Sequence, residues 1–347
     1  LYPSLMLSRK IAPGQDRLGV FLRLLDRLRA FRLDAKARMQ KSEAEADRTY
    51  YDALQSTFKV LINSFYGYLG FPQARFSDFS AAEEVTRQGR ELLRSMIEWL
   101  KTHGAKPIEI DTDGIYFVPP PDCGSGPGNE PSQKATNRAL ESFRKALADS
   151  LPRGIEVEFD GEYRSMYSYK MKNYALLSWE GEMIIKGAAL KSRGLEPFQR
   201  SFLELAIRLK LEGKAGEIAA LKASYEEAIR GRQWPIDRLA KTENLQDSPS
   251  TYEAKKSQSG RSRSAVYELA LKSGKEYRAG DQISYYVTGA RKSVAVHENS
   301  RLVSDWNPGS RDENVAYYLA KLEALYEKFG KTDAQGELEL TLDGPKD

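Results

Sequence analysis

Apolar residues recur at three- and four-residue spacing in two segments near the start of the chain. In residues 15–39 they are Leu18, Phe21, Leu22, Leu25, Leu28 and Phe31, and in residues 50–65 they are Leu54, Phe58, Leu61, Ile62 and Phe65. This spacing predicts two amphipathic helices. Because a polar stretch at residues 42–48 separates them, we expect an antiparallel helical hairpin whose second helix ends at Gly67.

Both predicted helices also carry a polar stripe. Arg29, Arg32 and Lys36 fall at i, i+3 and i+7, so a helix stacks three cations on one face, where like charges repel by roughly a few tenths of a kcal/mol per pair. The second helix has Lys59, Asn63 and Tyr66 at i, i+4 and i+7. The cationic stripe is either a solvated face or a site for an anionic ligand.

Alternating apolar residues flank two carboxylates in the middle of the chain. Ile108 and Ile110 precede Asp111-Thr112-Asp113-Gly114, and Ile115 and Phe117 follow it. This pattern predicts a β-hairpin with Asp-Gly turn chemistry. A divalent cation would relieve the repulsion between the carboxylates, and oxygen ligands suit Mg²⁺. The alternative is a plain surface turn. An EF-hand is excluded, because its twelfth position would be Asp122 instead of Glu.

The rest of the chain mixes helices and strands irregularly. We expect helices at residues 81–101, 135–150, 198–211, 215–230 and 313–329, strands at 155–159, 174–179 and 183–186, and a surface loop at 119–132. This order favours an α+β fold over a doubly wound sheet. We place a domain boundary near Gly194, where the character of the sequence changes.

Composition narrows the class of protein without identifying it. A chain of 347 residues with 41% hydrophobic and 29% charged residues should fold, as two or three subdomains. Its net charge of +4 means that a polyanion must be met by local clusters of cations. The single Cys123 excludes an internal disulfide framework, and His103 and His297 are too few for a His-rich zinc site. We expect no membrane span, since no apolar run approaches ~20 residues.

Three motifs occur in an order that points to a known family. They are Leu1-Tyr2-Pro3-Ser4, Lys59-Val60-Leu61-Ile62-Asn63-Ser64-Phe65-Tyr66-Gly67 and Asp111-Thr112-Asp113. In order and approximate spacing they resemble the S-L-Y-P-S, K-x-x-x-N-S-x-Y-G and D-T-D motifs of family B DNA polymerases, in particular the bacterial polymerase II-like branch. Arg32 to Lys36 resembles the family's finger R-x-x-x-K, and Lys172-Asn173-Tyr174 resembles its primer-contacting K-x-Y.

The resemblance covers the first ~190 residues and thins beyond them. Ile185-Lys186-Gly187 fits the family's lead into the thumb, but Lys191-Ser192-Arg193-Gly194 stands where Arg-Arg-Asp is expected. The segment Gly260-Arg261-Ser262-Arg263-Ser264 lacks the Pro-His of a thumb motif. Lys255, Lys256, Arg261 and Arg263 either follow a DNA backbone or lie in a mobile loop.

The resemblance implies a role for each matching residue. Asp111 and Asp113 would hold two Mg²⁺ ions, with Asp113 the more direct ligand. The residues that would bind dNTP are Leu1, Tyr2, Arg32, Lys36, Lys59, Asn63 and Tyr66; the three cations meet the triphosphate, Tyr2 excludes a 2′-hydroxyl, and Asn63 and Tyr66 shape the base-pair pocket. The residues that would contact DNA are Gly67, Thr112, Lys172, Tyr174 and Lys186. If the order of the motifs is set aside, Tyr66 is interpreted as a core residue, Asn63 as a helix cap and Lys172 as an exposed lysine at the edge of a sheet.

The expected architecture is an α+β right hand that extends a primer 3′-hydroxyl with dNTPs on a template. Its palm comprises residues 1–14 and 68–194, its helical-hairpin fingers 15–67, and its mostly helical thumb 195–347. Primer-template DNA and dNTPs are the expected partners, and a sliding clamp is a further one for the parent protein. We expect a monomer from the bacterial cytoplasm.

A third carboxylate belongs to the family's first motif, four positions before the Leu, and so falls upstream of Leu1. We therefore expect residues 1–347 to be a fragment without N-terminal and exonuclease domains, able to bind DNA but weak or inactive in primer extension.

Two other functions stay open. A non-catalytic DNA-binding relative is disfavoured by the intact Asp111 and Asp113, and an Asp four positions before Leu1 in the parent sequence would favour the enzyme. An RNA-synthesising, primase-like nucleotidyltransferase is disfavoured by Tyr2, and a comparison of rNTP with dNTP incorporation tests it.

Overall fold

Two units, each with its own hydrophobic core, divide the chain between Gly161 and Glu162. The computed structural model describes residues 1–111, 114–123, 133–187, 194–259 and 262–331. The mixture of helices and antiparallel sheets confirms the expected α+β class. The division differs from the boundary placed near Gly194, and the palm, fingers and thumb limits stay a prediction. No helix among the described residues is both long and apolar enough to cross a membrane.

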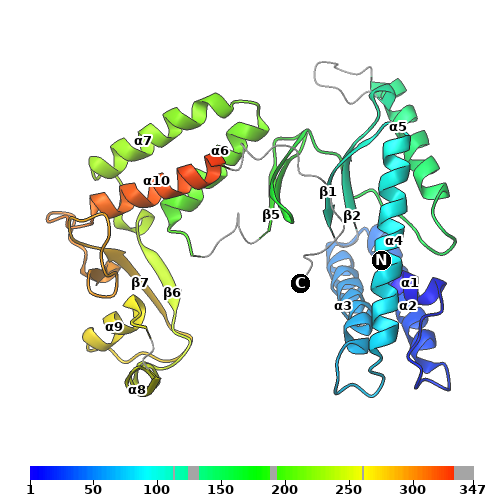
Figure 1. Cartoon of the computed structure of the whole chain (residues 1–347), viewed down its shortest axis with the longest axis horizontal. Helices are drawn as coiled ribbons and strands as arrows, with labels where there is room; N and C mark the ends of the chain where they lie inside the picture. The colour runs from blue at the N-terminus through cyan, green and yellow to red at the C-terminus, as the bar shows by residue number, and fades with distance from the viewer. Residues whose placement is uncertain (112–113, 124–132, 188–193, 260–261, 332–347) are drawn as a thin grey trace. The chain divides into compact units, whose positions relative to one another are not determined.

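The unit Leu1–Gly161 is built on a helical hairpin, a long helix and a β-hairpin (Figure 1). Its elements are α1 (Tyr2–Ser8), α2 (Val20–Lys41), α3 (Glu45–Leu69), α4 (Phe79–Thr102), β1 (Lys106–Asp111), β2 (Gly114–Val118), the short 3₁₀ turn η1 (Pro121–Cys123) and α5 (Gln133–Asp149). Helices α2 and α3 pack along each other, which confirms the predicted hairpin. Met6, Phe21, Leu25, Ile62 and Leu69 form the core where α1 to α4 meet.

The helical hairpin differs from prediction at its ends. Helix α2 starts at Val20 because the carboxylate of Asp16 accepts hydrogen bonds from the N–H groups of Val20 and Phe21, at 3.0 and 2.7 Å, and Gly19 adopts φ 62° before them. The predicted end of α3 at Gly67 is wrong: the helix continues to Leu69, which is fully buried. Burial of this leucine outweighs the roughly 1 kcal/mol cost of a glycine within a helix.

The second unit contains two small antiparallel sheets and most of the remaining helices. Its elements are β3 (Ser165–Lys170), β4 (Asn173–Leu177), β5 (Met183–Lys186), α6 (Pro197–Leu211), η2 (Ala215–Glu217), α7 (Ile218–Arg230), η3 (Ile236–Arg238), β6 (Lys241–Asn244), α8 (Pro249–Ser259), α9 (Ala265–Lys272), β7 (Gln282–Val287), β8 (Ser300–Leu302), η4 (Val303–Asp305) and α10 (Val315–Lys331). The sheets have the orders β3-β4-β5 and β6-β7-β8. Phe198, Phe202, Tyr286, Tyr318 and Leu322 lie at the centre of its larger core.

The strand predicted at residues 155–159 is wrong, since these residues belong to no strand. Their side chains do alternate, because residues 155, 157 and 159 are half-buried while residues 156, 158 and 160 are exposed. The alternation that suggested a strand is therefore present, but the outward side chains pair with α2 instead of joining a sheet. Strands β3, β6, β7 and β8 were not predicted.

Candidate active site

The β1–β2 hairpin ends at the predicted catalytic carboxylates. Asp111 is the last residue of β1, and its backbone pairs with Gly114, the first residue of β2. The predicted β-hairpin is thus confirmed, while Thr112, Asp113 and the side chain of Asp111 lie outside the described residues, so the Asp-Gly turn chemistry stays a prediction. Ile115 and Phe117 pack from β2 onto a small core around Leu100 and Leu147, which holds the hairpin against α4 and α5. Among the described side chains, no three His, Cys, Asp or Glu gather as a metal site.

Three predicted phosphate-binding cations stabilise the ionised form of a single carboxylate, that of Glu158. The ammonium of Lys36 donates a hydrogen bond to Oε1 of Glu158 at 2.8 Å. That bond first, and then the charges of Lys36, Arg32 and Lys59, hold the pKa of the Glu158 carboxyl below its usual range. Arg32 and Lys36 come from α2 and Lys59 from α3, so the hairpin gathers cations from both helices. Lys36 thus contacts Glu158 directly, and the charges of Arg32 and Lys59 act on the same carboxylate.

Arg32 retains an unused hydrogen-bond donor. Its Nε atom is buried and has no hydrogen-bond partner in the described structure. A buried donor without a partner costs about 1–3 kcal/mol. An anionic ligand with several oxygen atoms would satisfy this donor, because guanidinium groups bind such ligands through more than one N–H.

Two predicted nucleotide-pocket tyrosines are in contact. The rings of Tyr2, at the start of α1, and Tyr66, near the end of α3, have centroids 4.5 Å apart and an interplanar angle of 42°. Burial raises the pKa of the Tyr66 phenol, Tyr2 adds to the shift, and Arg90 opposes it. Both rings are half-buried against the core of α1 to α4, so each has one packed side and one accessible side.

A glycine on α4 makes room for Tyr2, and sequence reasoning missed it. A Cβ atom added to Gly89 would lie 3.2 Å from Cε1 of Tyr2 and 3.6 Å from side-chain atoms of Leu1 and Leu5. Gly89 is buried within the helix, where glycine costs about 1 kcal/mol relative to alanine. The isolated glycine inside an amphipathic helical pattern was the signal that could have identified it.

Asn63 and Gly67 lie on the exposed side of α3. Asn63 is within the helix, so it is not a helix cap. A Cβ atom added to Gly67 would meet no described atom within 4 Å, so no neighbour in the described structure requires a glycine there. Their assignments to the base-pair pocket and to DNA stay predictions.

The predicted primer-contacting residues lie in the other unit, on the β3-β4-β5 sheet. Tyr174 on β4 and Lys186 on β5 are direct cross-strand partners. Tyr174 is 3% exposed, whereas Lys172 is exposed in the β3–β4 turn with φ 61°. A Cβ atom on Gly187 would overlap the side-chain oxygen of Asn173 and the backbone oxygen of Lys172, so this glycine packs directly under the turn.

The cations of the predicted thumb stretch have carboxylate partners. Lys255 pairs with Asp247 and Lys256 with Glu268, both at 3.0 Å, and Arg263 lies 3.8 Å from Glu298. Lys255 and Lys256 belong to helix α8 and not to a loop, and Arg261 lies outside the described residues. Their contact with a DNA backbone stays a prediction.

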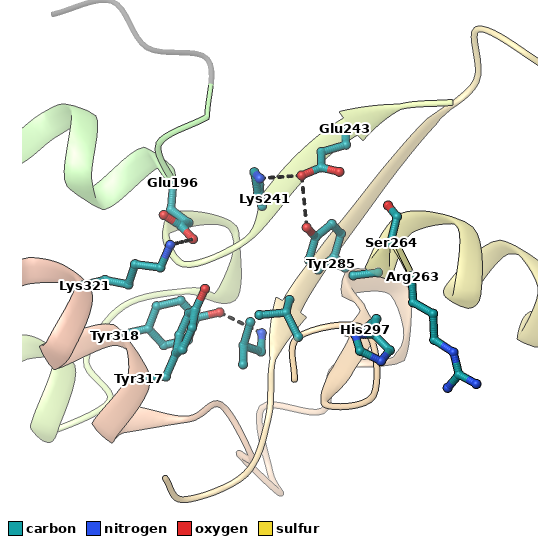
Figure 2. A pocket seen from close by; sticks show the side chains of 13 residues that line it. Glu196, Lys241, Glu243, Arg263, Ser264, Tyr285, His297, Tyr317, Tyr318 and Lys321 are labelled. Carbon is teal, nitrogen blue, oxygen red and sulfur yellow. Dashed lines mark hydrogen bonds and ion pairs between the residues drawn. The ribbon is translucent and has the colours of Figure 1, made fainter. Parts of the chain in front are cut away.

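A cavity of about 370 Å³ also lies in the second unit (Figure 2). Glu196, Lys241, Glu243, Tyr285 and Lys321 are among its lining residues, as is Arg263, and none of the residues assigned to catalysis, dNTP or primer contact is. Lys321 approaches Glu196 at 3.8 Å, Lys241 pairs with Glu243, and the phenol of Tyr285 donates a hydrogen bond to Glu243 at 3.1 Å. The lining charges therefore pair mostly with one another.

Comparisons with known proteins agree with the motif order. A family model described as DNA polymerase family B matches residues 6–117 and 130–328. A DNA polymerase 1 from Pyrococcus abyssi is 29% identical over 264 residues, which cover 70% of this chain and 32% of that protein. A DNA polymerase from Pyrococcus glycovorans is 27% identical over 347 residues, which cover 92% of this chain and 42% of that protein.

A solved structure shares the fold. The family B DNA polymerase from the hyperthermophilic archaeon Pyrobaculum calidifontis matches with a TM-score of 0.68 at 19% identity, covering 100% of this chain and 44% of that one. This chain thus spans less than half the length of each relative named here. All three relatives are archaeal, so they lend no support to the expected bacterial, polymerase II-like affiliation.

Proposed function

Because this chain belongs to DNA polymerase family B, we propose that it forms the polymerase core of a template-directed DNA polymerase. Its reaction would be the extension of a primer 3′-hydroxyl with dNTPs. The observation that carries this proposal is the ion pair of Lys36 with Glu158 at 2.8 Å, on a carboxylate whose pKa the charges of Arg32 and Lys59 also lower. Phosphoryl transfer asks a protein mainly for positioning and charge neutralisation, and a triphosphate needs such a group of cations.

The incoming nucleotide would meet residues of three helices, α1, α2 and α3. Arg32, Lys36 and Lys59 would bind the triphosphate. The buried Nε of Arg32, which has no hydrogen-bond partner in the described structure, would then donate to a phosphate oxygen. Tyr2, with Leu1 beside it, would pack under the deoxyribose and exclude a 2′-hydroxyl. The contact of Tyr2 with Tyr66, and the close packing of Tyr2 on Gly89, support a fixed position for this ring. Asn63 and Tyr66 would shape the base-pair pocket.

The donor chemistry of the β1–β2 hairpin fits Mg²⁺, because Asp111 and Asp113 place two carboxylates at its tip. We propose these two residues as metal ligands, with Asp113 the more direct one. Two bound ions would neutralise charge at the attacking 3′-oxygen and at the leaving pyrophosphate. The packing of Ile115 and Phe117 would keep the hairpin tip fixed during this step.

Primer-template DNA would be held by Gly67, Thr112, Lys172, Tyr174 and Lys186. The exposed Lys172 suits a contact with a DNA phosphate. Tyr174 is buried, so it suits a role in fixing strand β4 beside the DNA-binding residues. Likeness to a family B structure supports the assignment of palm (1–14 and 68–194), fingers (15–67) and thumb (195–347). We further propose a monomeric state, a sliding-clamp partner for the parent protein and a bacterial cytoplasmic location.

Primer extension with Mg²⁺ and dNTPs tests the proposal. The assay compares residues 1–347 with a chain lengthened upstream of Leu1, each beside its Asp113→Ala variant. Asp122→Ala, at an exposed acid of the same region, is the matched control. We expect extension that Asp113→Ala abolishes and Asp122→Ala preserves, with primer-template binding intact in both.

DNA binding without extension by any form would favour the non-catalytic DNA-binding alternative. Equal use of rNTPs and dNTPs would favour an RNA-synthesising nucleotidyltransferase. Extension that survives Asp113→Ala would contradict the assignment of the catalytic hairpin.

A further inference from the structure

An acidic segment lies against the cationic face of α2. We call residues 155–160 the acidic strap; their sequence is Ile-Glu-Val-Glu-Phe-Asp. Glu156 approaches Arg29 at 3.6 Å, and Glu158 approaches Lys36 at 2.8 Å. The two carboxylates are two residues apart, and the two cations are two helical turns apart, so strap and helix run along each other over this distance.

The strap is attached at one end to the core beneath the catalytic hairpin. Phe159 packs against the small core around Leu100 and Leu147, as do Ile115 and Phe117 of β2 and Phe143 of α5. The guanidinium of Arg144 lies 5.0 Å from the centroid of the Phe159 ring. The strap thus joins the hairpin that carries Asp111 to the helix that carries Arg32 and Lys36, within one unit of the chain.

The carboxylate of Glu158 lies against Lys36, one of the cations of the proposed triphosphate site. Lys36, Arg32 and Lys59 all stabilise its ionised form. These are also the three cations that we assign to the triphosphate. A carboxylate and a phosphate oxygen are alternative acceptors for the same donors, and their negative charges repel each other, so the two compete for Lys36.

We propose that the acidic strap is an internal competitor of the nucleotide triphosphate, with Glu158 occupying the phosphate position in the empty protein. This inference rests on the proposed nucleotide site. Glu158 keeps Lys36 and its neighbours gathered before the nucleotide binds, and it must leave Lys36 when the triphosphate arrives.

The strength of these ion pairs suits a reversible competitor. The side chains of Glu156 and Glu158 are 78% and 80% exposed, and exposed pairs change an equilibrium constant by only roughly two- to fivefold. A triphosphate carries several negative charges and can accept hydrogen bonds from several donors together. The strap therefore weakens nucleotide binding without preventing it.

Binding of inorganic triphosphate to residues 1–347, measured by titration calorimetry at low salt without Mg²⁺, tests this inference. We compare the wild type with Glu158→Gln, which keeps the size of the side chain and removes its charge. Asp34→Asn is the matched control, because it removes one negative charge from α2 at a residue that pairs with Arg38 instead. Lys36→Gln tests the site itself.

We expect Glu158→Gln to lower the Kd roughly two- to fivefold, Asp34→Asn to leave it unchanged and Lys36→Gln to raise it. The gain from Glu158→Gln should shrink as salt rises, since exposed charges are screened. Equal affinities of Glu158→Gln and Asp34→Asn, with Lys36→Gln still weakened, would overturn the competitor role and leave the nucleotide site standing. Binding that is absent, or indifferent to Lys36→Gln, would overturn the nucleotide site and the competitor role together.

Discussion

Tyr2 and Tyr66 meet with ring centroids 4.5 Å apart, although one begins α1 and the other lies near the end of α3. This aromatic contact joins the motif at residues 1–4 to the motif at residues 59–67. A change at Tyr2 therefore alters the surroundings of Tyr66, and nucleotide selection should depend on both rings.

Tyr2→Ala should relax discrimination against ribonucleotides, because it removes the ring that would exclude a 2′-hydroxyl. We expect the ratio of kcat/KM for dCTP over CTP to fall about tenfold or more. Tyr2→Phe keeps the ring and is the control, expected to retain the ratio. An unchanged ratio in Tyr2→Ala would remove Tyr2 from sugar selection.

Two glycines within helices should respond differently to alanine. Gly67→Ala should raise the free energy of unfolding by about 0.5–1 kcal/mol, since the added methyl group meets no described atom within 4 Å and alanine favours helix. Gly89→Ala should gain less or lose stability, because its methyl group presses on Tyr2 at 3.2 Å. Urea unfolding of both variants measures the difference, and equal gains would contradict the close packing of Tyr2 on α4.

Gly67→Ala also tests the assignment of Gly67 to DNA contact. A methyl group that stabilises the free protein should weaken primer-template binding if DNA approaches this backbone closely. Fluorescence anisotropy with a labelled primer-template measures the Kd. A Kd equal to that of the wild type would remove Gly67 from the DNA interface.

Asp78 should stabilise the fold in a pH-dependent way. Its carboxylate accepts hydrogen bonds from the N–H groups of Gly14 and Ala81 at 2.8 and 2.9 Å, and these bonds lower its pKa. Since the folded pKa is below the unfolded value of about 3.9, the contribution is fully present above that pH and is lost as pH falls through the folded pKa. Asp78→Ala should cost about 1 kcal/mol at neutral pH.

Unfolding free energies of the wild type and Asp78→Ala, measured from neutral pH downward, should converge in acid. Glu98→Ala, at an exposed acid within the same helix, is the control and should show no such convergence. A constant difference between wild type and Asp78→Ala across the pH range would mean that the ionised carboxylate is not the stabilising group.

Gly187→Ala should weaken primer-template binding. Gly187 and Gly181 have φ values of 95° and 85°, so alanine costs roughly 1–3 kcal/mol of backbone strain at either position. Only at Gly187 does the added methyl group also overlap the turn that carries Lys172. We expect fluorescence anisotropy to give a higher Kd for Gly187→Ala than for the control Gly181→Ala. Equal Kd values would contradict the assignment of Lys172 to the primer-template interface.

Helical periodicity and turn chemistry predicted most of the described elements of the first unit. The α2–α3 hairpin and the β1–β2 hairpin depend on patterns that local sequence carries by itself, namely three- and four-residue spacing and an Asp-Gly turn. The polar strand β6, with the sequence Lys-Thr-Glu-Asn, has no apolar alternation and forms because β7 pairs with it. Such a strand depends on tertiary pairing, which a single sequence does not reveal.

The predicted site stays a prediction, but the placement of its cations follows from helices of predictable phase. Arg32 and Lys36 share a face of α2, and packing of α3 adds Lys59. Glu158 and Gly89 could not be assigned from spacing, because each acts through a neighbour that is distant in sequence. Contacts of this kind require the fold to be known.

The α2–α3 hairpin is fastened at its base. The N–H of Gly14 donates to Asp78 at 2.8 Å, and the side-chain amide of Gln15 donates to the backbone oxygen of Ser77 at 2.7 Å. Since the two ends of the intervening segment are held together, its length contributes only weakly to the entropy of closing it. The α2–α3 hairpin can therefore change in length during evolution or by engineering, while α4 and the β1–β2 hairpin stay unchanged.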